Sequence, residues 1–218
     1  MGDVDYSNEL RQFYEMRSKT VIENLQKKNM DGFYVPNRQE ALALVLSLVP
    51  PGAVVGRGDS MTLNQLDVIE ELQKRGQNRI INPVQTDEKG HNPKREERRQ
   101  LQREALTSDV YLTSTNAITL EGTIVSTDGA GNRVAAMMFG PKKTIVVTGG
   151  NKIVQDLDEA LKRIRNFCAP LNALRHQTKH RQEGLGWGAL RYTAIIDGCQ
   201  PAEKGRITVI IVGEDLGI

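Results

Sequence analysis

The sequence contains little cysteine. Only two cysteines, Cys168 and Cys199, occur in 218 residues, and they lie far apart. Such a pair encodes neither a disulfide framework nor a Cys-x-x-Cys metal site. We therefore expect two ordinary thiols.

An excess of charge of one sign and long apolar runs are also missing. The 29 basic and 27 acidic residues give a formal net charge of +2, whereas a nucleic-acid binder normally has a marked basic excess. No apolar run approaches the roughly 20 residues that a membrane-spanning helix needs. Residues 1–5 have neither the basic nor the apolar region of a signal peptide. These absences predict a cytoplasmic protein that binds neither nucleic acid nor membrane.

What is present suits one folded domain. Apolar residues make up 39% and charged residues 26% of the chain, as is typical of globular proteins. A chain of 218 residues is long enough for one large domain and short for two. We expect a single domain over residues 1–218, with an N-terminal helix within 1–30 and a variable loop region at 176–204 before the last strand.

Short apolar runs alternate with stretches of helical spacing. They predict strands near 33–35, 53–55, 78–82, 110–112, 145–147 and 206–213, and helices near 7–28, 37–48, 62–72, 93–106, 132–139 and 151–167. Strands that alternate with helices in this way are typical of an α/β domain. The sequence therefore predicts an α/β fold with a largely parallel sheet flanked by helices.

Polar groups and glycines gather between two of these strands, within residues 113–150. The polar residues are Asn116, Glu121, Asp128, Asn132 and Arg133, and the glycines are Gly122, Gly129, Gly131 and Gly140. Loops of this composition commonly carry function, because they present polar groups that a core would not accept. We interpret the stretch as a site.

The turn at 128–133 has the features of an anion site. Glycine adopts positive φ at little cost, so Gly129 and Gly131 would let backbone N–H groups approach a ligand. Asn132 stands where a helix N-cap is expected, and Gly140 would end that helix. The unpaired N–H groups at a helix N-terminus favour an anion. The alternative is a tight hairpin and a helix cap without a ligand.

A second glycine loop follows the strand predicted near 53–55 and reads Gly56-Arg57-Gly58-Asp59-Ser60-Met61-Thr62. Strand, glycine loop and helix again present N–H groups to an anion. In a parallel sheet such loops lie at the carboxyl ends of the strands, so both loops are expected to face one crevice. The alternative is a helix start that needs small residues. The predicted ligand-binding residues are Gly56, Gly58, Asp59, Ser60, Thr62, Asn116, Gly122, Asp128, Gly129, Gly131, Asn132 and Arg133.

Three runs resemble one known family. They are T-N-A-I-T at 115–119, D-G-A-G-N-R-V-A-A-M-M-F-G-P-K-K at 128–143 and V-V-T-G-G-N-K-I-V at 146–154. The chain resembles the LUD (lactate-utilisation) domain family from Tyr14 to about Asn172. This resemblance implies a fold like that of sugar-phosphate isomerases, CoA transferases and formyltetrahydrofolate cyclo-ligases. The cysteine-rich segment of many such proteins is reduced here to Cys199, which leaves a cluster role there without support and the cofactor unknown.

Two classes of function follow from the resemblance and the two loops. The first is an enzyme that acts on a small anionic metabolite of phosphate, carboxylate or CoA type, with Arg133 as a bidentate clamp. Glu121 would be its catalytic nucleophile or base, as in the acyl transfer of CoA transferases; the alternative is an exposed hairpin residue. The second is a non-catalytic subunit, or a metabolite-sensing module, of a lactate-oxidation assembly. An ATP- and folate-type ligase rests on fold analogy alone. A homo-oligomer or a protein partner stays open.

Two histidines lie four residues apart, at His176 and His180, and would share one helix face. No nearby acid or cysteine completes a ligand set, and Lys179 and Arg181 make the neighbourhood cationic, so we predict no metal site. The lone Trp187 lies in a glycine-rich stretch, where it would either cover a pocket or pack against the domain.

Overall fold

The computed structural model describes residues 5–86, 91, 93–180 and 191–218, with side chains left out for 176–180. The helices within these ranges are α1 (Ser7–Lys27), α2 (Arg38–Leu48), α3 (Met61–Gln65), α4 (Val68–Arg75), α5 (Arg95–Glu104), α6 (Asn132–Met138), α7 (Leu157–Arg163) and α8 (Ala169–His180). Short 3-10 helices are η1 (Ala105–Thr107), η2 (Gly150–Lys152) and η4 (Pro201–Glu203), and η3 (Ile164–Cys168) is a π-helical turn.

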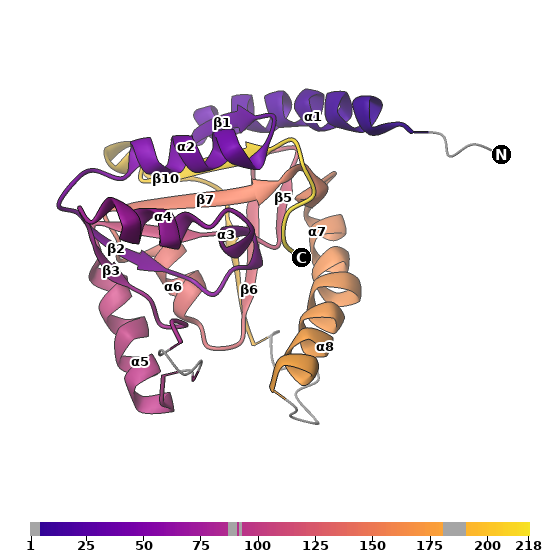
Figure 1. Ribbon diagram of the computed structural model, residues 1–218. Helices are drawn as coiled ribbons and strands as arrows, with labels where there is room; N and C mark the ends of the chain where they lie inside the picture. The colour runs from indigo at the N-terminus through magenta and orange to yellow at the C-terminus, as the bar shows by residue number, and fades with distance from the viewer. Residues whose placement is uncertain (1–4, 87–90, 92, 181–190) are drawn as a thin grey trace.

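Six strands form a parallel sheet in the order β1-β10-β7-β4-β2-β3. They are β1 (Asp31–Val35), β2 (Val54–Arg57), β3 (Arg79–Ile81), β4 (Val110–Thr113), β7 (Lys143–Gly149) and β10 (Ile207–Val212). Every pairing in this sheet is parallel. The predicted α/β architecture with a parallel sheet is confirmed (Figure 1).

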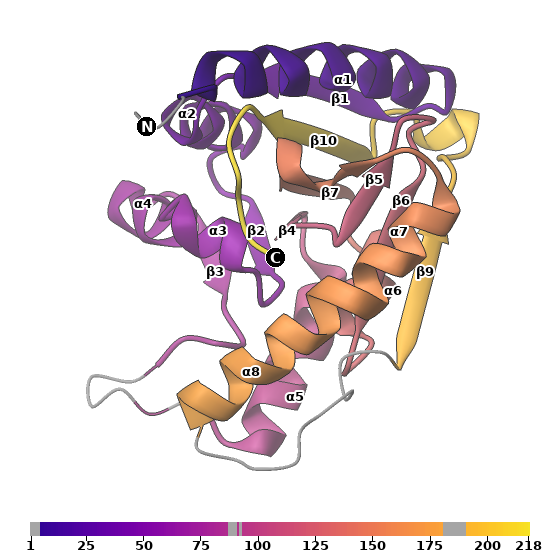
Figure 2. The same cartoon turned by 90° about the vertical axis from the view of Figure 1, so that its right-hand side faces the viewer.

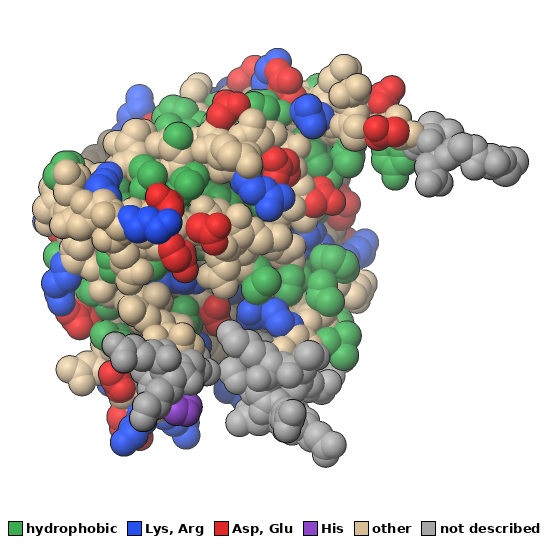
Figure 3. Space-filling view, in the orientation of Figure 1, with side chains coloured by type: hydrophobic (Ala, Val, Ile, Leu, Met, Phe, Trp, Pro, Cys, Tyr) green, Lys and Arg blue, Asp and Glu red, His purple; other side chains and the backbone are tan. Residues whose placement is uncertain are grey.

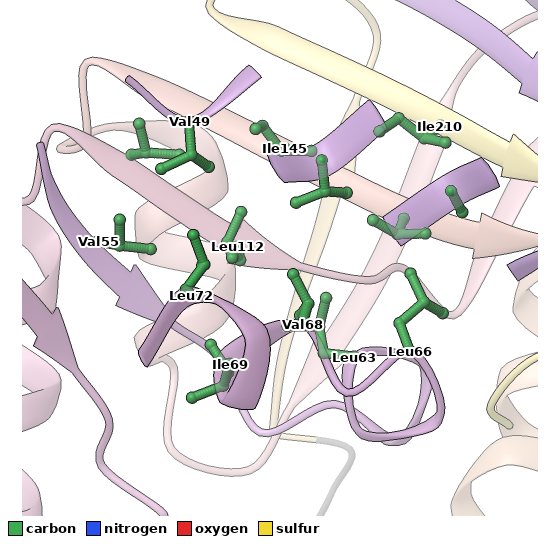
Figure 4. Packing of buried hydrophobic residues seen from close by; sticks show 14 of the residues in the cluster. Val49, Val55, Leu63, Leu66, Val68, Ile69, Leu72, Leu112, Ile145 and Ile210 are labelled. Atoms are coloured by element: carbon green, nitrogen blue, oxygen red, sulfur yellow. The ribbon is translucent and has the colours of Figure 1, made fainter. Parts of the chain in front are cut away.

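Both faces of this sheet are buried, which explains its continuous apolar strands. In β10, Ile210 and Val212 face α2, α3 and α4, whereas Ile207, Val209 and Ile211 face the opposite core. Figure 4 shows the first core, where Leu63, Val68, Ile69 and Leu72 pack against Val55, Leu112 and Ile145 of the sheet. The alternation follows from the two-residue period of a strand.

A second, smaller sheet covers part of the other face. Its order is β8-β5-β6-β9, with β5 (Ala117–Thr119), β6 (Ile124–Asp128), β8 (Ile153–Val154) and β9 (Tyr192–Ile196). β5 and β6 form an antiparallel hairpin, and β9 pairs antiparallel with β6. Residues of α1, α6 and this sheet share one core with the large sheet. Ala160 of α7 and Ile164 of η3 pack against the other side of the second sheet. The sequence did not predict this sheet.

Local chemistry sets several helix starts. Asn37 caps α2 by accepting a hydrogen bond from the backbone N–H of Glu40 at 2.9 Å. Asp156 caps α7 in the same way, through Glu159 at 2.9 Å. Side-chain caps of this kind each contribute about 1 kcal/mol to helix stability.

Two stretches differ from their predicted structure. The helix expected over 151–167 begins only at α7, because Ile153 and Val154 pair with β5 as strand β8. Within 176–204, expected as loop, strand β9 pairs with β6 over Tyr192–Ile196. Trp187 lies outside the described residues. In the described part of the chain, no helix combines the length and apolarity that crossing a membrane requires.

α7, η3 and α8 form one rod that begins against one face of the second sheet and extends beyond it (Figure 2). The π-helical turn at 164–168 comes directly before Pro170 in the first turn of α8. A π-bulge is one of the few ways in which a helix accommodates a break in its hydrogen bonding. The rod therefore passes Pro170 without ending and places α8 opposite α3 and α5.

Candidate functional site

A cavity of about 330 Å³ lies where β2, β4 and β6 reach their carboxyl ends. Its walls come from the loop that leads into α3, the residues after β4, the turn before α6, and η3 and α8. Open parallel sheets bind ligands at this edge. Its volume suits a small metabolite.

Both predicted glycine loops line this one cavity. The predicted ligand-binding residues found in its wall are Asp59, Ser60, Thr62, Asn116, Asp128, Gly129, Asn132 and Arg133. The first loop comes from the parallel sheet and the second from the carboxyl end of β6. The expectation that the two loops share a crevice is thus met in the geometry of the fold.

The remaining predicted glycines, Gly56, Gly58, Gly122 and Gly131, lie outside the cavity wall. A Cβ on Gly56 would lie 2.9 Å from the Ser108 hydroxyl, so Gly56 permits close packing. Gly122 and Gly131 have φ values of 81° and 87° in turns. Gly129 does not have a positive φ. The turn therefore contains one left-handed glycine, Gly131, where two were predicted.

Glu121 is separated from the cavity. It is exposed in the turn between β5 and β6, outside the cavity wall. Its neighbour Gly122 packs against the backbone of α1 at Leu25. The other end of the same hairpin carries Asn116 and Asp128 into the cavity. A hairpin places its turn and its open end at opposite ends of the strands, so the predicted catalytic role of Glu121 in this cavity has no geometric basis.

In the turn before α6, the carboxylate of Asp128 takes the place of a bound anion. One oxygen of Asp128 accepts a hydrogen bond from the backbone N–H of Arg133 at 2.8 Å, and the other accepts from Ala130 at 3.2 Å. Gly131, not Asn132, is the N-cap residue of α6. Two of the backbone N–H groups in the turn that was predicted to hold a ligand, those of Ala130 and Arg133, are therefore already engaged by Asp128.

Arginine side chains supply the cationic wall instead. Arg133 donates from Nη2 to the carbonyl of Thr127 at 2.6 Å, and its buried Nε has no hydrogen-bond partner among the described residues. Arg57 is 4% exposed, and its guanidinium donates to Asn64 and to the carbonyl of Gly58. Burial lowers the pKa of Arg57. A buried guanidinium without a carboxylate in contact favours an anion beside it.

Two further arginines approach from α5 and α8. Arg98 and Arg175 lie 3.8 Å and 4.0 Å from a carboxylate oxygen of Asp59. Arg175 also donates to Asn172 of its own helix at 3.0 Å. At these separations Asp59 neutralises the two guanidinium groups only in part. Asp59, predicted to touch a ligand, is thus placed to orient arginines.

Sequence reasoning missed Lys152, which lies in η2 directly after β7. Its side chain is 2% exposed yet lines the cavity. The Nζ atom donates to the hydroxyls of Thr62 and Ser114, each at 3.1 Å, and to the carbonyl of Thr115 at 3.2 Å. Burial, followed by the charge of Arg163, lowers the pKa of Lys152 to about 7. Close to neutral pH this amine exists in both charged and neutral forms.

The rod of α7 and η3 supports this corner of the cavity. Arg163 donates to the carbonyl of Asn116 at 2.9 Å and contacts the sulfur of Cys168. Asn116 in turn accepts at 2.8 Å from the backbone N–H of Thr127, which joins β5 to β6. Cys168 is 3% exposed and lines the cavity, so one of the two free cysteines lies in the site.

Among the residues that the structure describes, no group of three or more histidines, cysteines or acids could hold a metal ion. His176 and His180 belong to α8, but their side chains lie outside the described residues.

Comparisons with known proteins agree with this architecture. Residues 18–212 match the model of the LUD domain family. Among solved structures, a DUF162 family protein from Deinococcus radiodurans is similar with a TM-score of 0.50 and 16% identity, over 93% of this chain and 97% of that one. At that identity the likeness concerns the fold alone. No curated protein matches the chain.

Proposed function

We propose, since the chain belongs to the LUD domain family, that its cavity binds a small anionic metabolite through arginine side chains. The main support for this proposal is the excess of positively charged side chains in the cavity wall. Its described lining holds six basic residues, Arg57, Arg98, Arg133, Lys152, Arg175 and Arg191, against two acidic residues, Asp59 and Asp128. A cleft with such an imbalance concentrates anions and holds them by charge-assisted hydrogen bonds.

The size of the cavity limits the size of the ligand that can bind. About 330 Å³ is at the lower end of the range for small-molecule sites, so a carboxylate or phosphate of few carbon atoms fits better than a whole CoA thioester. A hydroxy or oxo acid of the size of lactate is consistent with the lactate-utilisation role of the family. We place such acids first among candidate ligands.

The position of the chain's acidic groups supports binding over acyl transfer. Glu121 is exposed outside the cavity, and Asp128 accepts two backbone hydrogen bonds. Neither of these two carboxylates is free inside the cavity to attack an acyl group, as acyl transfer through an enzyme-bound carboxylate would require. The remaining acid of the cavity, Asp59, is paired with Arg98 and Arg175 at 3.8 Å and 4.0 Å. This observation favours the second function, a metabolite-binding subunit or sensing module, over a CoA-transferase-like enzyme.

The test is calorimetry or thermal shift of the purified protein with lactate, pyruvate, sugar phosphates, nucleotides, CoA thioesters and folates, because a ligand of the native state raises its melting temperature. Arg133→Gln and Arg175→Gln should weaken binding of a hit by about tenfold or more, since each removes a charge-assisted hydrogen bond. Arg79→Gln is the matched control, because Arg79 pairs with Glu104 outside the cavity wall. Absence of a shift from every class, or equal losses in all three variants, would refute the proposal.

A further inference from the structure

The buried amine of Lys152 has a set of hydrogen-bond partners that anion binding alone does not explain. The amine of Lys152 is 2% exposed, and the partners of its Nζ are two hydroxyls and a carbonyl, from Thr62, Ser114 and Thr115. No carboxylate is among the hydrogen-bond partners of this amine in the described residues. Buried lysines normally pair with an acid, because an isolated buried charge is costly.

The charged surroundings push the same amine toward its neutral form. Arg163 on α7 and Arg133 on α6 both act on Lys152 and lower its pKa, while Cys168 on η3 acts in the opposite direction. Burial has the largest effect, and together they bring the pKa to about 7. A desolvated lysine beside other cations is a chemically activated amine, because at neutral pH a substantial fraction of it is in the neutral form with a free lone pair.

We propose that Lys152 forms a Schiff base with a small aldehyde or oxo acid that carries a carboxylate or phosphate group. This inference rests on the proposed function, since the arginines of the cavity would hold the anionic group while the amine meets the carbonyl carbon. A Schiff base at Lys152 restricts the proposed ligands from small anions in general to those that also have a carbonyl group.

The covalent step balances without a further reagent. The nitrogen lone pair of Lys152 attacks the carbonyl carbon, and the carbonyl oxygen takes up a proton to give a carbinolamine. This first proton is supplied by the nitrogen, which becomes a neutral secondary amine. The hydroxyl then takes up a second proton, the C–O bond breaks as the nitrogen lone pair forms the C=N bond, and one water leaves. The nitrogen finally loses its last proton, which replaces the second proton taken up, to give the imine. No atom is oxidised or reduced. The hydroxyls of Thr62 and Ser114, each 3.1 Å from Nζ, are placed to pass protons during these steps.

The residues around Lys152 also restrict the side from which a carbonyl compound can reach its amine. A Cβ on Gly217 would come within 2.8 Å of Nζ and 2.4 Å of the Thr62 hydroxyl, so the backbone at 217 closes one side of the amine. The carbonyl compound must then reach the amine from the cavity, whose wall also contains Arg133 and Arg175. This path brings the anionic group of the ligand to the guanidinium groups as its carbonyl reaches Lys152.

The experiment is reductive trapping on the full chain. The protein is incubated with glyoxylate or pyruvate and sodium cyanoborohydride, and the modified lysine is found by peptide mass spectrometry. We expect modification at Lys152 that saturates with probe concentration and exceeds that of any other lysine. Lys152→Met should lose this adduct, whereas Lys142→Met should keep it, because Lys142 is exposed and paired with Asp109. Peptide mapping of the wild-type protein identifies the modified lysine even if the Lys152 variant fails to fold.

The outcomes separate this inference from the proposed function. Lactate binding measured by calorimetry without an adduct at Lys152 would overturn the Schiff base and leave anion binding intact. Modification spread over surface lysines at rates that do not saturate would overturn it in the same way. Absence of a Lys152 adduct together with absence of binding by every ligand class tested would refute anion binding as well.

Discussion

The pH dependence of stability provides a direct test of the environment of Lys152. In the folded protein its pKa is about 7, against 10.5 for an ordinary lysine. Below the lower value the amine is charged in both states, so the full cost of burying the charge is present. Between the two values the unfolded chain holds up to one more proton than the folded protein. Stability contributed by this group therefore rises with pH across that window.

The magnitude follows from the difference between the two pKa values. Each pH unit in the window changes the free energy of unfolding by up to about 1.4 kcal/mol. From about pH 6.5 to about pH 9 the sum is roughly 2 to 3 kcal/mol, because the slope is reduced near the folded pKa. Methionine has a similar length and no charge, so Lys152→Met should remove this rise. The charged and titratable groups that face the amine, Arg163, Arg133 and Cys168, are kept in both proteins.

The assay is urea unfolding of wild type and Lys152→Met, followed by far-ultraviolet circular dichroism at several pH values across this window. The free energy of unfolding of wild type minus that of the variant should increase with pH. Lys142→Met is the control, since Lys142 is exposed and its pKa is raised by Asp109, so no such increase is expected there. A difference that is flat or that falls with pH would refute a buried amine with a lowered pKa.

Two further predictions concern the loops around the cavity. Gly131→Ala should lower the free energy of unfolding by about 1 to 2 kcal/mol, because Gly131 has a φ of 87° in a region that costs a residue with a Cβ about that much. Gly129→Ala is its matched control in urea unfolding and should cost less; equal losses would contradict the assignment of strain to Gly131. Glu121→Gln should leave both ligand affinity and trapping at Lys152 unchanged, because Glu121 is exposed outside the cavity. A loss of either, seen in calorimetry or mass spectrometry, would return Glu121 to the site.

Local patterns predicted much of the parallel sheet and both loops. The strand, glycine loop and helix around Gly56 and Thr62 are decided by residues close in sequence, and the alternation of strands and helices then fixes where such loops gather. Eight predicted residues accordingly meet in one cavity. The family resemblance is also confirmed by the match over residues 18–212.

Features decided by distant contacts could not be found in this way. Ile153 and Val154 fit a helical pattern, but their pairing with β5 makes them a strand. Lys152 has its partners in Thr62 and Ser114, from two other parts of the chain, and a lone lysine after a strand is usually exposed. Glu121 was selected by its chemistry, whereas its location depends on how the hairpin packs against α1. The one available signal for Lys152 is its place within the run at 146–154 that carries the family resemblance.

The order of strands in the large sheet has a consequence for the way the protein is made. β10 lies between β1 and β7 and pairs with both along its length. It also follows both of them in the chain, so it leaves the ribosome after them. Until it docks, β1 and β7 present two unpaired edges to each other across a gap, and such edges readily pair with other chains. Nascent protein should therefore depend most on protection from aggregation in the interval before Ile207–Val212 closes the sheet.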